Sequence, residues 1–304
     1  MTFQDELAER AKLVNEALEK LLPPADAYPP PIHQAVRYSV FAGGKRLRPI
    51  LVMAGAEAVG GRIAAVMPAA CAIELLHTYS LVHDDLPAMD DDDLRRGQPT
   101  CHKVFGEAIA VLAGDAMLTA CFGILTQLSQ DTGIPPELVV KVTGELAEAA
   151  GANGLIGGQV ADLTAAGSAA GGTVNGTVNE AILRYIHAHK TGALIKASVR
   201  TGAILAGASA EQLAQLTAYA EDLGLAFQIV DDILDVVGDE QVIGKPVGSD
   251  QRNQKVTYPA LFGLEASRQK AAAAAARALS SLEGLGAEAD FLRRLIHFII
   301  NRDQ

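Results

Sequence analysis

The stretch that decides the fold of this chain runs from residue 84 to residue 96. It reads Asp84-Asp85-Leu86-Pro87-Ala88-Met89-Asp90-Asp91-Asp92-Asp93-Leu94-Arg95-Arg96. Residues 69–82 before it are rich in apolar side chains and predict a long helix, which ends here because Pro87 disfavours helix at the preceding residue. Asp84 and Asp85 therefore lie in the last turn of a helix, where the helix dipole already presents partial negative charge. Further anions at this place are unfavourable unless cations neutralise them.

The natural cations for such a cluster are hard divalent metal ions. Oxygen ligands suit these ions, and Mg²⁺ typically binds one or two carboxylates together with substrate phosphates. The alternative interpretation is an acidic loop in contact with water, which is the more common role of an isolated acidic run. A second cluster of aspartates strengthens the metal interpretation.

This second cluster consists of Asp231, Asp232 and Asp235. The surrounding residues 228–237 are mostly apolar and predict a largely buried helix. Asp231 and Asp235 are four residues apart, so they share one face of that helix. Buried like charges are destabilising unless ions or a basic ligand neutralise them. One such motif arises by chance, but two of them, each at or within an apolar helix, predict facing walls of one metal site.

Composition and length favour a single all-α domain over residues 1–304. The chain is 49% hydrophobic with only 5% aromatic residues and no Trp, and Ala and Leu are abundant, which favours packed helices over sheets. No linker-like break separates the aspartate clusters, and neither convincing strand alternation nor a fixed repeat is present. The predicted helices span residues 3–21, 32–41, 45–59, 69–82, 100–128, 136–150, 152–163, 179–206 and 210–237, with a helical tail. Residues 164–178 and 238–255 predict loops.

Charge and cysteine content limit the partners and the compartment. The net charge of −11 argues against a general nucleic-acid or anionic-membrane surface. Cys71, Cys101 and Cys121 lack metal-ligand spacing and predict reduced core thiols of a cytoplasmic protein. The polar N-terminus does not resemble a signal peptide, and the absence of an uninterrupted apolar run of about 18 residues predicts no membrane span.

Basic residues supply counter-charges in separate places. Lys45, Arg46 and Arg48 follow a Gly-Gly turn before a helix, where free backbone N–H groups favour phosphate. This is not a P-loop, because Ser39 stands at the first glycine position and an arginine follows the lysine. Further cations are Arg95, Arg96, Lys190, Lys245 and Lys255.

These charges predict a cavity with two anion positions. One diphosphate would be held through Mg²⁺ by the aspartate clusters and a second by Lys45, Arg48 and Arg96, while apolar helices take hydrocarbon tails. His77 lies two turns before Asp84 on the same helix face, where it either reaches a phosphate or is a hydrogen-bonded core histidine. His83, His187 and His189 are interpreted as structural.

Four stretches, taken together, resemble the signature regions of the trans-polyprenyl diphosphate synthases. They are residues 43–49, 84–96, 189–192 (His189-Lys190-Thr191-Gly192) and 227–235. Within that family the chain is most similar to bacterial farnesyl diphosphate synthases, whose first Asp-rich motif carries two extra residues. The resemblance implies a helical bundle of the isoprenoid synthase type with a central cavity, a prenyltransferase activity, and a homodimer.

The resemblance also implies roles for individual residues. Two or three Mg²⁺ ions, with Mn²⁺ as an alternative, would bind Asp84, Asp85, Asp90, Asp231 and Asp235. The allylic diphosphate would contact Arg95, Lys190 and Lys245, with Thr191 and Gln228 nearby, and isopentenyl diphosphate would contact Lys45, Arg48, His77 and Arg96. The sequence departs from the family at Gln254-Lys255-Val256-Thr257, where Gly-Lys often precedes Thr-Tyr-Pro, so the role of Lys255 stays open.

Product length follows from helix geometry. Tyr79 and Ser80 precede Asp84 by five and four residues, which places them about 6–8 Å deeper along the helix axis. A bulky ring there would form the floor of the tail cavity and stop elongation, whereas the small Ser80 would not. Since an aromatic residue at this depth accompanies C15 product in the family, we expect farnesyl diphosphate, with geranylgeranyl diphosphate or a longer product as the alternative.

Three other functions compete with this interpretation. A class I terpene cyclase is also all-α, but it binds one diphosphate and usually has a different second motif. A non-catalytic subunit that binds prenyl diphosphate would be expected to lose an aspartate cluster or the basic site. Calcium binding is disfavoured because residues 90–96 lack the ligand spacing of an EF-hand.

Overall fold

The computed structural model is built almost entirely of helices and describes residues 2–169, 180–237 and 257–302. In chain order the elements are α1 (Phe3–Leu21), α2 (Pro30–Phe41), α3 (Leu47–Glu57), α4 (Ile63–Asp84), β1 (Leu94–Arg95), β2 (Gln98–Pro99), α5 (Cys101–Phe105), α6 (Glu107–Thr132), α7 (Pro136–Ala150), α8 (Leu155–Ala169), α9 (Glu180–Ile186), η1 (His187–Gly192), α10 (Ala193–Leu205), α11 (Ala210–Val237), α14 (Tyr258–Phe262), α15 (Leu264–Ser281), η2 (Ala287–Ala289) and α16 (Asp290–Ile300). The predicted all-α fold class is confirmed.

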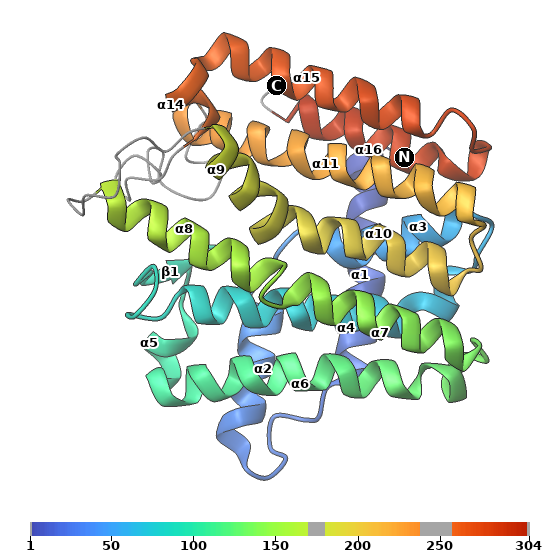
Figure 1. Cartoon of the computed structure of the whole chain (residues 1–304). Helices are drawn as coiled ribbons and strands as arrows, with labels where there is room; N and C mark the ends of the chain where they lie inside the picture. Colours follow the sequence, from blue (N-terminus) through green and yellow to red (C-terminus); the bar gives the residue numbers. More distant parts are fainter. Residues whose placement is uncertain (1, 170–179, 238–256, 303–304) are drawn as a thin grey trace.

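Helix α4 is the centre of the bundle. It is apolar on all sides and packs against α6, α3, α10, α1 and α2, so most of its side chains from Val66 to Val82 are buried. Figure 1 shows α4, α6, α7, α8, α10, α11 and α15 running roughly side by side, with α1 and α2 crossing behind them. The C-terminal ends of α4 and α11 lie at the same end of the bundle, so the two aspartate clusters are at one end as well.

Close backbone contact fixes α3 against α10. A Cβ atom added to Gly202 would lie 1.8 Å from the carbonyl oxygen of Val52, and one added to Gly55 would lie 2.2 Å from that of Val199. Such distances are far inside van der Waals contact, so only glycine permits this crossing. The short spacing holds α3, and the basic loop before it, firmly on the central layer.

Several predicted boundaries were wrong. The helix expected over 100–128 is divided at Gly106, which has a φ of +83° that L-residues rarely adopt, and its second part continues to Thr132. The helix expected over 152–163 runs from Leu155 to Ala169, so the predicted loop begins inside a helix. The helix expected from residue 69 starts at Ile63.

Two local features were absent from the prediction. Leu94 pairs with Pro99 and Arg95 with Gln98 in an antiparallel hairpin whose two strands, β1 and β2, have two residues each, although no strand was expected. Residues His187–Gly192 form a π-helix between α9 and α10. Both features place a basic residue of the candidate site, Arg95 in the first and Lys190 in the second.

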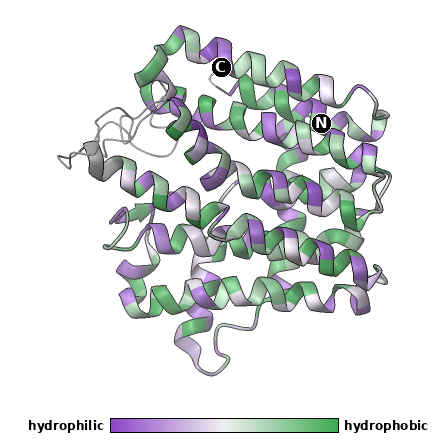
Figure 2. Cartoon of the chain, viewed as in Figure 1, coloured by the Kyte–Doolittle hydropathy of each residue, from purple (hydrophilic) through white to green (hydrophobic). Residues whose placement is uncertain are grey.

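Helices α4 and α6 are each long and apolar enough to cross a membrane by length and composition alone. The most apolar window of α4 is 72% buried inside the protein, as expected of a core helix, whereas that of α6 is only 33% buried. Figure 2 shows hydrophobic residues distributed along the whole of α6. Length and composition of these helices therefore do not support the prediction of no membrane span, and the exposed face of α6 needs a separate explanation.

Candidate active site

The first aspartate cluster lies where α4 ends. Asp84 is the last residue of the helix, and its carbonyl accepts the backbone N–H of Asp90 at 2.9 Å, which folds the loop back onto the helix end. Asp85 is 3% exposed and accepts a hydrogen bond from Nε of Arg95 at 2.6 Å. The β1–β2 hairpin therefore returns a guanidinium group to the anions that precede it in the chain.

The pKa of Asp84 is shifted far from the usual value of an aspartate. Burial raises its pKa to about 6; Lys190 opposes the rise, Asp90 and Asp85 add to it, and Arg95 lowers it. Lys190, far away in the sequence, is thus an electrostatic neighbour of the first cluster. Its Nζ lies 2.7 Å from Oδ2 of Asp162, a residue of α8 that sequence reasoning missed.

The predicted second anion site also comes together. Nη1 of Arg48, on α3, lies 3.1 Å from Nε2 of His77, on α4, and Nη1 of Arg96 donates to the carbonyl of Gly43. Burial lowers the pKa of Arg48 to about 10, with Glu74 opposing and Arg96 adding to the effect. Burial and the surrounding guanidinium groups, Arg48 first, hold the pKa of His77 well below its usual value, so the imidazole is neutral.

Arg46 has a different role from its neighbours in the basic loop. It is 3% exposed and adopts the left-handed conformation before α3. Its guanidinium group donates to Asn15 Oδ1 at 2.8 Å, to Glu74 Oε1 at 2.6 Å and to the carbonyl of Val40 at 2.5 Å. Arg46 therefore ties the loop to α1 and α4 and leaves Lys45 and Arg48 to meet a ligand.

Lys45 connects this basic site to the second aspartate cluster. Partial burial lowers the pKa of Lys45, Arg302 lowers it further, and Asp231 opposes both. Arg302 lies over the ring of Phe227 at 4.6 Å and was also missed, because it follows the last apolar helix of the chain and carries no pattern of its own.

The three aspartates of the second cluster differ in burial and in their contacts. Asp232 is buried and accepts the backbone N–H of Tyr258 at 2.9 Å, with His187 Nε2 3.8 Å away, so it holds α14 against α11. Asp235 is 2% exposed, while Asp231 is half-buried and is an electrostatic neighbour of Lys45. Thr191 lies in the π-helix and Gln228 one turn before Asp231, both half-buried. Lys245 and Lys255 lie outside the described residues.

Across residues 2–169, 180–237 and 257–302, no three His, Cys, Asp or Glu side chains stand close enough together to hold a metal ion alone. The donors nevertheless fit Mg²⁺, since this ion keeps few carboxylates and completes its shell with phosphate oxygens and water. The carboxylates that would hold such ions are those predicted from the sequence: Asp84, Asp85, Asp90, Asp231 and Asp235.

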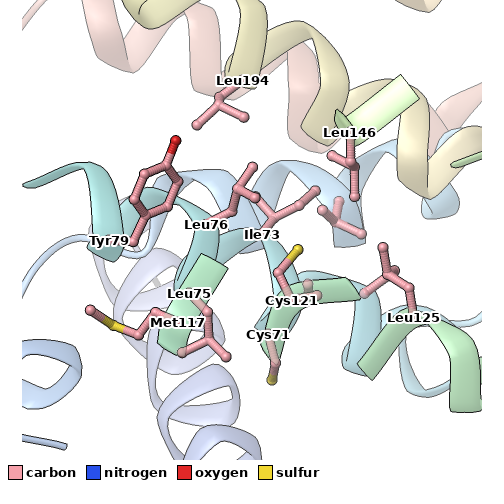
Figure 3. Packing of buried hydrophobic residues seen from close by; sticks show 14 of the residues in the cluster. Cys71, Ile73, Leu75, Leu76, Tyr79, Met117, Cys121, Leu125, Leu146 and Leu194 are labelled. Atoms are coloured by element: carbon pink, nitrogen blue, oxygen red, sulfur yellow. The ribbon is translucent and has the colours of Figure 1, made fainter. Parts of the chain in front are cut away.

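Tyr79, which the sequence predicts to be the floor of the tail cavity, is a buried residue of α4. It is 4% exposed, and Figure 3 shows its ring projecting from α4 with the hydroxyl towards Leu194. The hydroxyl has no hydrogen-bond partner in the described part of the chain, and burial raises the pKa of the phenol to about 12. The hydroxyl of Ser80 instead bonds to the carbonyl of His77 at 2.8 Å, so it adds no bulk.

An all-α bundle with two acidic clusters and a separate basic site at one end defines an enzyme that handles diphosphates. The sequence model described as Polyprenyl synthetase matches residues 29–285, and the chain belongs to this family. It is therefore a prenyltransferase that acts on small-molecule diphosphates, and members of the family generally use divalent metal ions.

Three similar proteins illustrate the range of the family. A farnesyl diphosphate synthase of Geobacillus stearothermophilus is 46% identical over 299 residues, which cover 97% of each chain. A chloroplastic heterodimeric geranylgeranyl pyrophosphate synthase large subunit of Arabidopsis thaliana is 48% identical over 267 residues, covering 88% of this chain and 70% of that one. The crystal structure of an FPP/GFPP synthase from Zymomonas mobilis superposes with a TM-score of 0.85 at 35% identity, covering 98% of both chains.

The raised pKa of Asp84 predicts how Asp84→Asn changes stability with pH. Because the pKa in the folded state, about 6, lies above the unfolded value of 3.8, the folded protein binds more protons between these values, and this carboxyl destabilises the fold increasingly as pH rises through that window. In metal-free buffer the variant should melt above the wild type at pH 7.5, with a difference that shrinks towards pH 4. Asp131→Asn, at the exposed end of α6, is the control and should change little. A variant that melts below the wild type at pH 7.5 would contradict this account.

Proposed function

We propose that the protein condenses an allylic diphosphate, dimethylallyl or geranyl, with isopentenyl diphosphate. The observation that supports this proposal is that a mainly acidic and a basic group of side chains lie at one end of the bundle, where each would bind one diphosphate. The Asp84 loop with Lys190 and the Asp231 side of α11 form the first, and Arg48, His77, Arg96 and Lys45 form the second. A cyclase, which binds one diphosphate, has no use for the second site.

The allylic diphosphate would lie between the two aspartate clusters. Asp84, Asp85, Asp90, Asp231 and Asp235 would hold Mg²⁺, two or three ions in all, which neutralises the diphosphate and makes it a better leaving group. Arg95, Lys190 and Lys245 would bind its oxygens, and Thr191 and Gln228 would lie beside the reacting carbons. Arg is suited to paired phosphate contacts and Lys to single ones.

Isopentenyl diphosphate would bind the basic site directly. Arg48 and Arg96 provide guanidinium donors, Lys45 an ammonium group, and neutral His77 one N–H donor. When the allylic C–O bond breaks, the electron pair leaves with the diphosphate, and the isopentenyl double bond attacks the allylic cation to form the new C–C bond. A proton then leaves to the departing diphosphate, so no side-chain base is required.

Product analysis tests this function. Purified protein with dimethylallyl and isopentenyl diphosphates should give metal-dependent prenyl diphosphates, read as alcohols after dephosphorylation, and EDTA should abolish them. A cyclic hydrocarbon formed from a longer diphosphate, without condensation, would instead establish a cyclase. Binding of either diphosphate without turnover would establish a carrier subunit.

We propose farnesyl diphosphate as the main product, because Tyr79 is the bulky residue at the depth where a C15 tail ends. The relatives include both farnesyl and geranylgeranyl synthases, so geranylgeranyl diphosphate is the second candidate. Tyr79 belongs to the buried cluster that includes Leu76, Met117, Cys121 and Leu194. Its ring therefore borders apolar side chains that would accept a longer tail once it is removed.

Replacement of this ring should lengthen the product. In Tyr79→Ala the main alcohol should shift from C15 to C20 or longer, while Tyr79→Phe, which keeps the ring and loses only the unpaired hydroxyl, should remain at C15. The alanine variant also leaves a cavity that costs about 3–5 kcal/mol, so its fold is checked by circular dichroism before assay. An unchanged product length in a folded Tyr79→Ala protein would exclude Tyr79 as the floor.

We propose further that the protein is a cytoplasmic homodimer that binds no nucleic acid and spans no membrane. The three cysteines are free and buried, which suits a reducing compartment. On the outward face of α6, Val111 is 40% and Leu112 54% exposed, side by side near the start of the helix. The name of the Arabidopsis relative, a large subunit of a heterodimer, supports subunit pairing of this kind of chain. A second copy of the chain would cover the α6 face.

A charge on this face should separate the subunits. The wild type should have twice the 31.7 kDa mass of the chain by light scattering, and Leu112→Glu should shift the mass towards that of one chain. Leu13→Glu, which changes a leucine on α1 that is 43% exposed, is the control and should stay dimeric. A monomeric wild type, or a Leu112→Glu protein that stays dimeric, would show that α6 is not the contact.

A further inference from the structure

Gln159 is a buried amide that the aspartate and arginine motifs do not account for. Its side chain is 6% exposed, and neither Oε1 nor Nε2 has a hydrogen-bond partner among the described residues. A buried polar group that makes no hydrogen bond destabilises a fold, and such groups are rare. A residue with two unpaired atoms of opposite hydrogen-bonding character indicates a ligand that supplies both partners.

The neighbours of Gln159 place it at the active site. Leu155, Gln159 and Asp162 lie at positions i, i+4 and i+7 of α8, so they share one helical face. Asp162 binds Lys190 at 2.7 Å, and a Cβ on Gly158 would lie 2.1 Å from the backbone nitrogen of Lys190. Helix α8 therefore touches the π-helix at this level, directly beside Gln159.

The other end of the same face is apolar. Leu155 is buried in the core cluster that also contains Tyr79 and Leu194. The amide thus lies between a lysine that would bind diphosphate and the apolar side chains that would receive the hydrocarbon tail. In an allylic diphosphate the carbon that reacts occupies this same boundary, between the charged head and the tail.

We propose that Gln159 is a further catalytic residue of the allylic site, with its amide facing the bond that breaks; this inference rests on the proposed prenyltransferase function. During ionisation the C–O bond breaks and its electron pair leaves on the diphosphate oxygen, where Nε2 donates a hydrogen bond. The positive charge spreads over the allylic carbons, where the lone pairs of Oε1 stabilise it. The amide forms no covalent bond and transfers no proton, so it is unchanged after each turnover.

A carboxamide suits this position better than a charged group. It offers a strong dipole without net charge, so it neither competes for Mg²⁺ as a carboxylate would nor repels the cation as an ammonium would. In surroundings from which water is excluded, such a fixed dipole stabilises developing charge effectively. Since this charge exists only in the transition state, the contribution of Gln159 should appear in kcat and not in substrate binding.

The test is Gln159→Met, which keeps the length and volume of the side chain and removes both polar atoms. In single-turnover and steady-state assays with dimethylallyl and isopentenyl diphosphates, kcat should fall about 100-fold, as for loss of one preorganised polar group in other enzymes. KM for the allylic substrate should stay within about threefold of wild type, because ground-state binding is not the target. The melting temperature of the ligand-free variant should equal or exceed that of the wild type. Gln269→Met, an exposed helical glutamine on α15, is the control and should alter neither value.

The remaining outcomes overturn the inference. An unchanged kcat, or a raised KM at unchanged kcat, would exclude a role in the transition state. A lower melting temperature, or failure to fold, would show that the amide has a structural partner. An inactive wild type would overturn the proposed function together with this inference, whereas an active wild type with a fully active Gln159→Met variant would overturn this inference alone.

Discussion

The rest of the structure depends on the repulsion between carboxylates at the buried end of α4. Burial is the main cause that raises the pKa of Asp84 to about 6, with Asp90 and Asp85 contributing and Lys190 and Arg95 opposing. Cationic side chains from other segments lie close to these carboxylates. Arg95, in the β1–β2 hairpin, donates to Asp85, and Lys190, in the π-helix, is an electrostatic neighbour of Asp84. A divalent cation bound at this end of the bundle would neutralise the remaining negative charge of the carboxylates.

Several buried polar groups near the candidate site destabilise the fold, in contrast to the apolar core around them. Glu74 Oε2, the Tyr79 hydroxyl and the Gln159 amide are all buried without hydrogen-bond partners within the described residues. Proteins commonly accept such losses where the unpaired groups act on a ligand. The tight α3–α10 crossing and the buried Arg46–Glu74 pair supply the rigid frame that makes this tolerable. The helices that make the bundle rigid are thus direct neighbours of the helices that carry the candidate site.

Sequence periodicity predicted the long helices well. Three helices, α1, α7 and α11, have the boundaries expected from their apolar pattern. The first aspartate cluster lies at the end of α4, as Pro87 predicts, and Asp231 and Asp235 share a helix, α11, as predicted. The break at Gly106 was missed because a lone glycine in a helical pattern does not reveal its φ angle. Asp162, Gln159 and Arg302 were missed because their importance comes from contacts between distant segments, for which no short motif exists.

The π-helix between Ile186 and Ala193 has a consequence for the length of the chain at this point. The hydrogen bonds of a π turn enclose one residue more than those of an α turn. In an α-helix each residue adds a rotation of about 100° around the helix axis. Deleting one residue here would restore a regular helix but rotate α9 against α10, so that one of them would turn its apolar face to solvent. Inserting or deleting a residue in this segment would therefore misorient the flanking helices, whichever side chain is involved. The direction in which Lys190 points likewise depends on the number of residues in the segment.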